Sequence, residues 1–220
     1  MAITQNEVIA SHMHIGNLKK LASTKTRSFW LDMIQGLVIV NPDKVVNALE
    51  AAREKFLQAK KDGKEILVLC QKSLFADEIP ELAKDVGFHY MNYKVPAGFL
   101  TNFDTLIMSI VAMNQLHSFI ESEDFGKLTK KEQLTMNRKL QKMQQVYKWV
   151  KNLKKKPDLV IVVDGKSMMK FVKELKKLDL DNIVLAGTNF DMWRPEDKLV
   201  VLNMDAYQSV KTAIRYILGA

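Results

Sequence analysis

Short apolar runs that alternate with helical segments constrain the fold of this chain more than any other feature of its sequence. Apolar runs without polar alternation are typical of strands covered on both faces. Strands that alternate with helices predict a parallel sheet in a doubly wound α/β fold. We expect strands at residues 37–40, 65–69, 89–91, 158–163, 182–186 and 199–202.

Start and stop residues mark the helices between these runs. Asn41 and Pro42 suit the cap and the first position of a helix that ends near Gly63. Further helices are expected at residues 73–86, 167–178 and 205–218. Residues 1–35 contain no strong pattern, so we expect an irregular N-terminal segment with a short helical piece at 6–11.

Residues 101–156 read as an insertion of two helices that fold back on each other. Apolar residues recur in steps of three and four, the spacing of a two-stranded coiled-coil seam. Thr101, with Asp104, is a candidate cap for the first arm, and Thr129 with Glu132 forms a capping box for the second. The seam residues are Phe103, Leu106, Ile110, Met113, His117, Ile120, Met136, Leu140, Met143, Tyr147 and Val150.

This pattern divides the chain into a body, residues 1–100 and 157–220, and an inserted hairpin, residues 101–156. The length of 220 residues suits one domain with such an appendage. No apolar run approaches the ~20 residues of a membrane span, and the N-terminus lacks a secretory pattern. The single cysteine, Cys70, excludes an internal disulfide and suits a reducing compartment.

Positive charge is concentrated on the second arm of the expected hairpin. Residues 127–156 contain ten lysines and Arg138 against one acid, Glu132, a net charge of +10. The whole chain carries +8, so the remainder is slightly acidic. A solvated lysine face is the alternative for such a run. Because almost no acid relieves the repulsion, the sequence favours a polyanionic partner, with nucleic acid ahead of a membrane surface.

A second basic stretch precedes two aromatic residues near the N-terminus. Bases of RNA stack on aromatic rings while lysines contact phosphates, so Phe29 and Trp30 after this stretch suit RNA. Packing of both rings against the core is an equal alternative. The basic residues of this stretch are Lys19, Lys20, Lys25 and Arg27.

The strand ends offer little catalytic chemistry. Asp164 to Ser167 resembles the end of a phosphate loop, but Val160 occupies the position of the glycine that such a loop needs. The histidines and Cys70 lack the spacing of a metal site, and no nucleophile motif is present. Asp164 and Asp191 end or follow strands and are the candidate acid or base of an alternative function, an enzyme that acts on an anionic substrate. We expect no cofactor.

The start of the first hairpin arm is a third candidate for RNA contact. Thr101 and Asn102 lie at a helix N-terminus, where free N–H groups and a positive potential suit a phosphate. Plain capping explains the same residues equally well.

Several motifs, in order and spacing, resemble the family of the second protein of the small ribosomal subunit. That family has Gly-Gly-x-Leu-Thr-Asn before a helical hairpin, Leu-x-Lys-Lys-Glu at its second arm and Pro-Asp-x-x-x-Val-x-Asp after it. Lys94 to Pro96 depart from the family's tryptophan, and Ala97 replaces its first glycine, which suggests a divergent bacterial or organellar-type member. The matching stretches are His14 to Gly16, Ala97 to Phe103, Leu128 to Glu132, Pro157 to Asp164, Thr188 to Asp191 and Asn203 to Ala206.

The resemblance implies a flavodoxin-like sheet with a protruding coiled-coil hairpin. It also implies a non-enzymatic structural component of the small subunit that binds small-subunit rRNA and neighbouring ribosomal proteins, including, in bacteria, the large mRNA-binding first protein. Such a protein is ribosome-bound in the cytoplasm or in an organelle matrix. Two alternatives to a ribosomal protein remain: the enzyme described above and a coiled-coil adaptor that binds acidic proteins. The expected RNA-binding residues are Lys19, Lys20, Lys25, Arg27, Thr101, Asn102, Lys130, Lys131, Arg138, Lys139, Lys142, Lys148, Lys151, Lys154 and Lys155.

Overall fold

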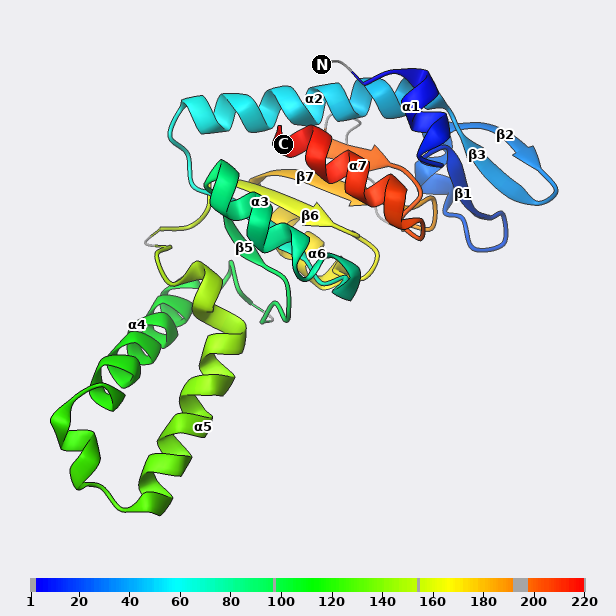
Figure 1. Ribbon diagram of the computed structural model, residues 1–220. Helices are drawn as coiled ribbons and strands as arrows, with labels where there is room; N and C mark the ends of the chain where they lie inside the picture. Colours follow the sequence, from blue (N-terminus) through cyan, green and yellow to red (C-terminus); the bar gives the residue numbers. More distant parts are fainter. Residues whose placement is uncertain (1–2, 97, 154, 192–197, 220) are drawn as a thin grey trace.

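A five-stranded parallel sheet forms the centre of the protein in the computed structural model, which describes residues 3–96, 98–153, 155–191 and 198–219 (Figure 1). The strand order is β5-β4-β6-β7-β8, with every neighbouring pair parallel. Counted along the chain this is 2-1-3-4-5, the order of flavodoxin-like doubly wound sheets. The strands are β4 (Ile66–Cys70), β5 (His89–Met91), β6 (Leu159–Val163), β7 (Asp181–Ala186) and β8 (Leu199–Val201).

The apolar runs that predicted these strands are buried because helices cover both faces of the sheet. Every residue of β4, β6 and β8 is buried. Arg53 of α2 donates a 3.0 Å hydrogen bond to the carbonyl of Tyr216 in α7, and Arg215 of α7 lies 2.7 Å from Glu78 of α3. The three helices therefore share one face. They are α2 (Pro42–Lys61), α3 (Glu78–Val86) and α7 (Tyr207–Leu218).

The remaining sheet helix, α6 (Met169–Lys177), covers the opposite face. From β4 the chain steps outward to β5, and from β6 it steps the other way to β7. Right-handed crossovers in opposite directions place their helices on opposite faces, here α3 on one and α6 on the other. The doubly wound α/β architecture predicted from the sequence is therefore present.

The N-terminal segment differs from the prediction, which was wrong to treat residues 1–35 as irregular. Three antiparallel strands in the order β1-β3-β2 form a second sheet there. The run 37–40 is the middle strand of this sheet and not a member of the parallel one. Only Val38 and Val40 of that strand are buried, because one face of the small sheet remains open. The elements are α1 (Gln5–Ala10), β1 (Ile15–Leu18), η1 (Thr24–Phe29), β2 (Trp30–Ile34) and β3 (Leu37–Val40).

The helix expected at 73–86 is also divided. A 3-10 turn, η2 (Ser73–Phe75), precedes α3, which begins at Glu78. Pro80 lies in the first turn of α3, the part of a helix where its missing N–H costs no hydrogen bond. Starting the helix further upstream would place Pro80 in its interior.

Two long helices extend away from the sheet between β5 and β6 (Figure 1). The helices α4 (Phe103–Ile120) and α5 (Lys130–Tyr147) lie side by side and contact each other. The 3-10 turn η3 (Glu123–Lys127) joins them, and η4 (Lys148–Val150) returns the chain to the body. No helix in the described ranges is long and apolar enough to cross a lipid bilayer.

Candidate nucleic-acid interface

The start of α5 is fixed by the capping box that the sequence predicted. The backbone N–H of Glu132 donates to the Thr129 hydroxyl at 3.4 Å, and the Glu132 carboxylate accepts from the backbone N–H of Thr129 at 3.0 Å. The Thr129 hydroxyl also donates to Glu132 at 2.7 Å. Hydrogen bonds from the hydroxyl and then the backbone of Thr129 hold the pKa of Glu132 below its usual value. The only acid of this arm therefore stays ionised at the helix start.

A narrow apolar stripe holds α5 against α4. Leu140 is the only buried residue of α5 among those described, and Met136 and Met143 beside it are half-buried. Across from them, Ile110 and Met113 of α4 are buried. Because the stripe is narrow, the outer faces of both helices remain exposed.

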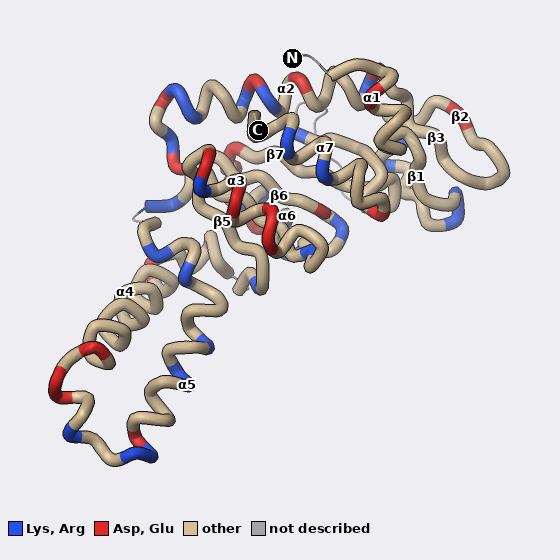
Figure 2. The backbone as a smooth tube through the Cα atoms, in the orientation of Figure 1, with Lys and Arg blue, Asp and Glu red and all other residues tan. Residues whose placement is uncertain are grey.

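The outer face of α5 is basic and without compensating acid. Lys127 and Lys155, at the two ends of the basic region, pair with Asp124 and Asp158 at 2.5 and 2.8 Å. Lys154 lies outside the described residues. The other expected basic contacts on this arm are exposed and form no ion pair with any described carboxylate: Lys130, Lys131, Arg138, Lys139, Lys142, Lys148 and Lys151. Figure 2 shows that basic residues recur along α5.

Helical spacing gathers three of these residues on one line. Lys131, Arg138 and Lys142 are separated by seven and four residues, so they share one side of the helix. Leu140 points the other way, into α4. Like charges at these spacings repel each other in the free protein. A phosphate backbone relieves that repulsion, so the arrangement suits a nucleic acid.

Two hollows at the root of α5 bring further basic residues together. One, of about 320 Å³, lies between the arms and is lined by residues that include His117, Lys148 and Lys151. The other, of about 350 Å³, is lined by Lys148, Lys151 and Trp149 together with residues of the body. Lys148 and Lys151 therefore face both hollows. Trp149 is not among the expected RNA-binding residues, although it lies between Lys148 and Lys151, and an aromatic residue beside basic ones was the signal at residues 19–30.

Trp149 also fixes the root of α5 on the sheet. Its ring stacks on that of Tyr90 in β5 with centroids 4.9 Å apart, and the ammonium of Lys148 lies 4.7 Å from the Trp149 centroid. Burial raises the pKa of Tyr90. The neutral phenol therefore serves as a packing surface for this end of the hairpin.

The root of α4 is fixed separately, by Glu174 of α6. Its carboxylate accepts the backbone N–H of Gly98 at 2.7 Å and that of Leu100 at 3.3 Å. Gly98 has a φ of +77°, a conformation that favours glycine. The Phe99 ring packs 6.2 Å from that of Phe171, also on α6. No pattern in the sequence pointed to Glu174, because its partners lie more than seventy residues away.

Thr101 was expected to cap α4, but it does not occupy the cap position. Asn102 occupies the cap position, and its side chain makes no capping hydrogen bond. The Gly98 carbonyl accepts the Asn102 N–H at 2.7 Å, so a turn precedes the helix and contains Thr101. Thr101 and Asn102 are both exposed beside the root of the hairpin.

The N-terminal basic stretch lies at the other end of the molecule from α5, around β1 and η1 (Figure 1). Its basic side chains are exposed, and Lys25 pairs with Asp191 at 3.2 Å. Phe29 is buried in the core, and the Trp30 ring donates to Thr26 at 3.1 Å. Phe29 is therefore a core residue and does not present its ring to a base. The two basic regions form separate surfaces.

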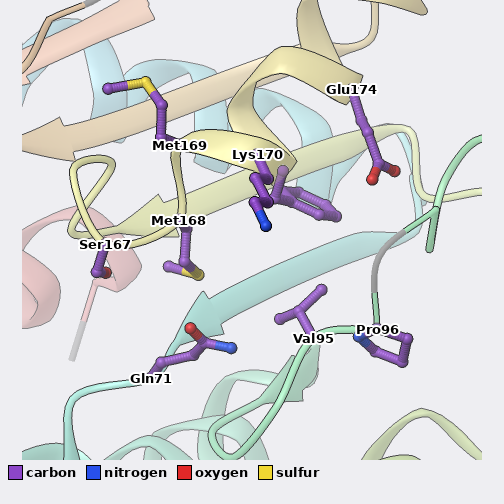
Figure 3. Close-up of a pocket in the computed structure, with 9 residues that line it drawn as sticks. Gln71, Val95, Pro96, Ser167, Met168, Met169, Lys170 and Glu174 are labelled. Carbon is purple, nitrogen blue, oxygen red and sulfur yellow. The ribbon is translucent and has the colours of Figure 1, made fainter.

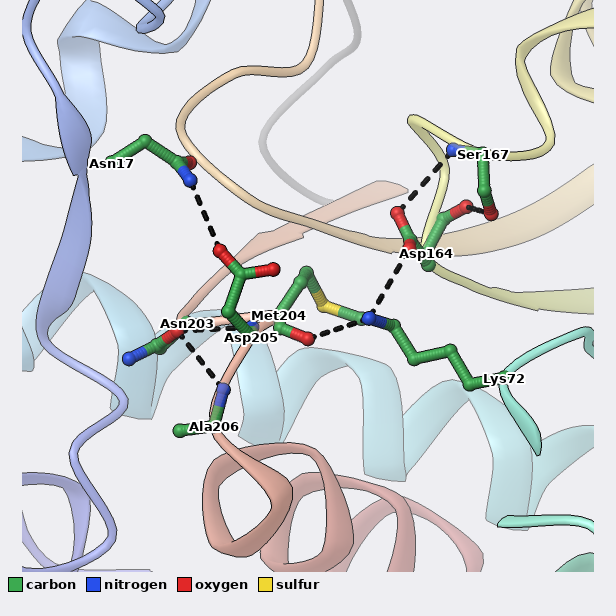
Figure 4. A network of polar contacts seen from close by, with 8 residues as sticks. All are labelled: Asn17, Lys72, Asp164, Ser167, Asn203, Met204, Asp205 and Ala206. Atoms are coloured by element: carbon green, nitrogen blue, oxygen red, sulfur yellow. Dashed lines mark hydrogen bonds and ion pairs between the residues drawn. The ribbon is translucent and has the colours of Figure 1, made fainter. Parts of the chain in front are cut away.

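The two strand-end carboxylates pair with different lysines: Asp164 with Lys72, as Figure 4 shows, and Asp191 with Lys25. Asp164, with φ +72°, lies 3.3 Å from Lys72, which also donates to the Met204 carbonyl at 2.7 Å. Asp191 pairs with Lys25, which together with Ser23 lowers its pKa. Gly165 follows Asp164 for packing reasons, since a Cβ there would meet Val184 at 2.5 Å.

A cavity of about 400 Å³ lies beside these strand ends (Figure 3). It is lined by Gln71 after β4, Val95 and Pro96 before α4, and residues 167–171 and Glu174 at α6. Neither Asp164 nor Asp191 lines it. The arrangement that the enzyme alternative requires, with both carboxylates converging in one polar pocket, is therefore not found at this cavity.

Comparison with known proteins identifies the family of this chain. The family model for ribosomal protein S2 matches residues 8–220. Small ribosomal subunit protein uS2 of Dictyoglomus thermophilum is 31% identical over 211 residues, which cover 95% of this chain and 85% of the relative. The uS2 proteins of Coprothermobacter proteolyticus and Geotalea uraniireducens are 29% and 28% identical over 95% of this chain, and the matches cover 78% and 81% of those proteins. This chain belongs to the ribosomal protein S2 family.

Proposed function

We propose that this chain, a structural component of the small ribosomal subunit, holds small-subunit rRNA chiefly through the outer face of α5. Membership of the family gives the structural role in the subunit. The observation that supports α5 as the RNA-binding element is its row of exposed basic side chains without acidic partners. Lys131, Arg138 and Lys142 contact phosphates along the row, and Lys148 and Lys151 do so at its root.

In this proposal, residues outside α5 also contact the small ribosomal subunit. Thr101 and Asn102 meet the RNA backbone beside the hairpin root, and Lys19, Lys20 and Arg27 meet it at the far end of the body. Residues 101–156 act as an inserted coiled-coil arm, and the body, residues 1–100 and 157–220, serves as a rigid platform. The body contacts neighbouring ribosomal proteins, including the large mRNA-binding first protein in bacteria. The chain is ribosome-bound, in the cytoplasm or in an organelle, and has no catalytic role.

The experiment that tests this proposal is sedimentation of the chain with ribosomal subunits through sucrose gradients. The wild-type chain is expected to travel with the small subunit and to be released when low magnesium unfolds its RNA. A variant with Lys131→Gln, Arg138→Gln and Lys142→Gln should shift toward the top of the gradient, because it loses three phosphate contacts. The three side chains are exposed, so their replacement leaves the core unchanged.

A charge-matched control separates this effect from a general loss of positive charge. Lys60, Lys61 and Lys84 are exposed on α2 and α3, and their replacement by Gln removes the same charge from the body. This control should sediment as the wild type does. Equal loss of both variants from the subunit, or retention of the chain by acidic proteins after RNase treatment, contradicts the assignment of α5 to RNA.

A further inference from the structure

The two arms of the hairpin carry net charges of opposite sign. Residues 95–126, which include α4 and the following turn, contain four acids and neither lysine nor arginine. Residues 127–156 carry +10. Figure 2 shows the same contrast between the two helices, with basic residues on α5 and none on α4. A surface that binds RNA phosphates is therefore not continued across the hairpin.

Exposed apolar side chains lie on the outer face of α4 instead. Met108 is 71% exposed, Val111 46% and Phe119 37%, although each is a large apolar side chain. Their spacing places them, with the exposed Ala112 and the polar Gln115, on the side of the helix that faces away from Ile110 and Met113 of the buried stripe. The Phe119 ring also packs against Phe125, with centroids 6.3 Å apart. Asp104 is the only Asp, Glu, Lys or Arg residue of α4. Single exposed apolar residues are ordinary, whereas a row along one helix marks an interaction surface.

Acids at both ends of α4 border this row, Asp104 in its first turn and the others after its last. Asp124 is already paired with Lys127 at 2.5 Å, and Glu121 lies 3.4 Å from His117. Glu123 and Asp104 form no ion pair with a described residue. The surface therefore presents an apolar centre with a negative margin. Such a margin repels phosphates and attracts lysine and arginine.

We propose that the outer face of α4 docks a basic polypeptide segment of a neighbouring protein, whose apolar side chains cover Met108, Val111 and Phe119 while its lysines or arginines face Asp104 and Glu123. The inference rests on the proposed function in one respect: α5 is taken to hold the RNA. The proposal assigns α4, the other arm of the hairpin, to contact with a protein. Methionine adapts its shape to a partner, and apolar centres with charged margins are typical of protein interfaces.

Photo-crosslinking in assembled small subunits tests both arms independently. Met108 in one full-length variant and Lys142 in another are replaced by p-benzoylphenylalanine, and purified subunits are irradiated. The Met108 variant should give an adduct that survives RNase, and the crosslinked peptide should carry lysine or arginine beside apolar residues. The Lys142 variant should label rRNA.

The crosslinks from Met108 and Lys142 distinguish failure of the docking proposal from failure of the proposed function. A Met108 adduct to rRNA, to lipid or to a second copy of this chain overturns the docking proposal, as does the absence of any Met108 adduct in subunits where Lys142 labels rRNA. Failure of Lys142 to label rRNA in assembled subunits counts against the proposed function, while the Met108 result is still judged by the same criteria.

Affinity for the crosslinked segment provides the quantitative test. A synthetic peptide with the sequence of that segment is titrated against the full chain. Met108→Lys should weaken its binding roughly tenfold or more, because it removes an apolar contact and adds repulsion toward a basic peptide. Gln141→Lys adds the same charge on the exposed surface of α5 and should change the affinity less than about twofold. Equal weakening by both variants contradicts specific docking on α4.

Discussion

At the scale of single residues, Glu174 determines where the first hairpin arm leaves the body. Its carboxylate accepts two backbone N–H groups at the root of α4, at 2.7 and 3.3 Å. Hydrogen bonds to a charged acceptor are stronger than neutral ones, and they leave two N–H groups unsatisfied if the acceptor is lost. Glu174 is therefore a positioning residue for the hairpin.

Glu174→Gln should loosen this root. The amide accepts only through its oxygen, so one of the two N–H groups loses its partner, at a cost of about 1–2 kcal/mol. We expect faster hydrogen exchange at Gly98 and Leu100 and a lower free energy of unfolding in urea. Glu54→Gln on the exposed side of α2 is the control. Unchanged protection at both amides means that the aromatic contact of Phe99 holds the root alone.

The carboxylate of Asp158 makes the free energy of unfolding depend on pH in the acid range. Its carboxylate accepts from Lys155 at 2.8 Å and from the backbone N–H of Glu65 at 2.9 Å. The hydrogen bond from Lys155 contributes most to lowering its pKa, and the Glu65 N–H adds to it. The folded state thus binds the proton less tightly than the unfolded chain. Stabilisation is present above the ordinary aspartate pKa and is lost as pH falls through the lowered value.

Asp158→Asn should reveal this contribution as a difference between two denaturation curves. At about pH 7 the variant should be less stable by roughly 0.5–1 kcal/mol, a value suited to a partly exposed pair. The difference should shrink as pH falls below about 4, the ordinary aspartate pKa, and vanish once pH lies below the lowered pKa of Asp158. Asp77→Asn, at an exposed position without a capping hydrogen bond, corrects for the loss of one charge. A difference that is constant with pH contradicts the assignment to Asp158.

At the scale of elements, α5 relies on its cap because its own packing is thin. Only Leu140 is buried among its described residues, and its basic side chains repel each other. Thr129→Ala should lower the stability of the hairpin by about 1 kcal/mol, the usual cost of losing such a cap. Loss of helical circular dichroism on heating and hydrogen exchange in the first turn of α5 measure the effect.

The matched control for the cap is Thr135→Ala within the same helix. Thr135 donates to the carbonyl of Lys131 at 2.9 Å and is exposed. Alanine is the better helix former at such a position, so this variant should be neutral or slightly stabilising. Similar losses in both variants would falsify a specific role of the cap.

At the scale of the whole molecule, the two basic surfaces lie at opposite ends, so the salt dependence of RNA binding reports which of them is used. Log affinity falls with log salt by roughly 0.7 to 0.9 per neutralised phosphate. Replacing Lys131, Arg138 and Lys142 by Gln should therefore make the slope shallower by about two to three. The measurement is a titration of the full chain with its rRNA fragment at several salt concentrations.

The same titration distinguishes the second surface. Replacing Lys19, Lys20 and Arg27 by Gln removes equal charge from the exposed N-terminal stretch. If both ends contact RNA, both variants flatten the slope. A slope that neither variant changes is incompatible with binding through these residues.

Features that a few neighbouring residues specify could be predicted from the amino-acid sequence. The apolar runs predicted all five strands of the parallel sheet, and Thr129 with Glu132 predicted the start of α5, because strand burial and capping are local properties. The positive charge of α5 could also be predicted from the sequence, since residues on one helix share its surface. The ordered motifs identified the family in the same way.

Contacts between residues far apart in the chain could not be predicted from the sequence and became visible in the folded structure. The run 37–40 was correctly read as a strand, but its partners are β1 and β2, and pairing depends on the approach of separate segments. Glu174 and Gly98 are 76 residues apart, and Lys72 neutralises Asp164 across two strand ends. Hydrogen bonds and ion pairs act over a few ångströms, so they follow from the folded path of the chain and not from its order.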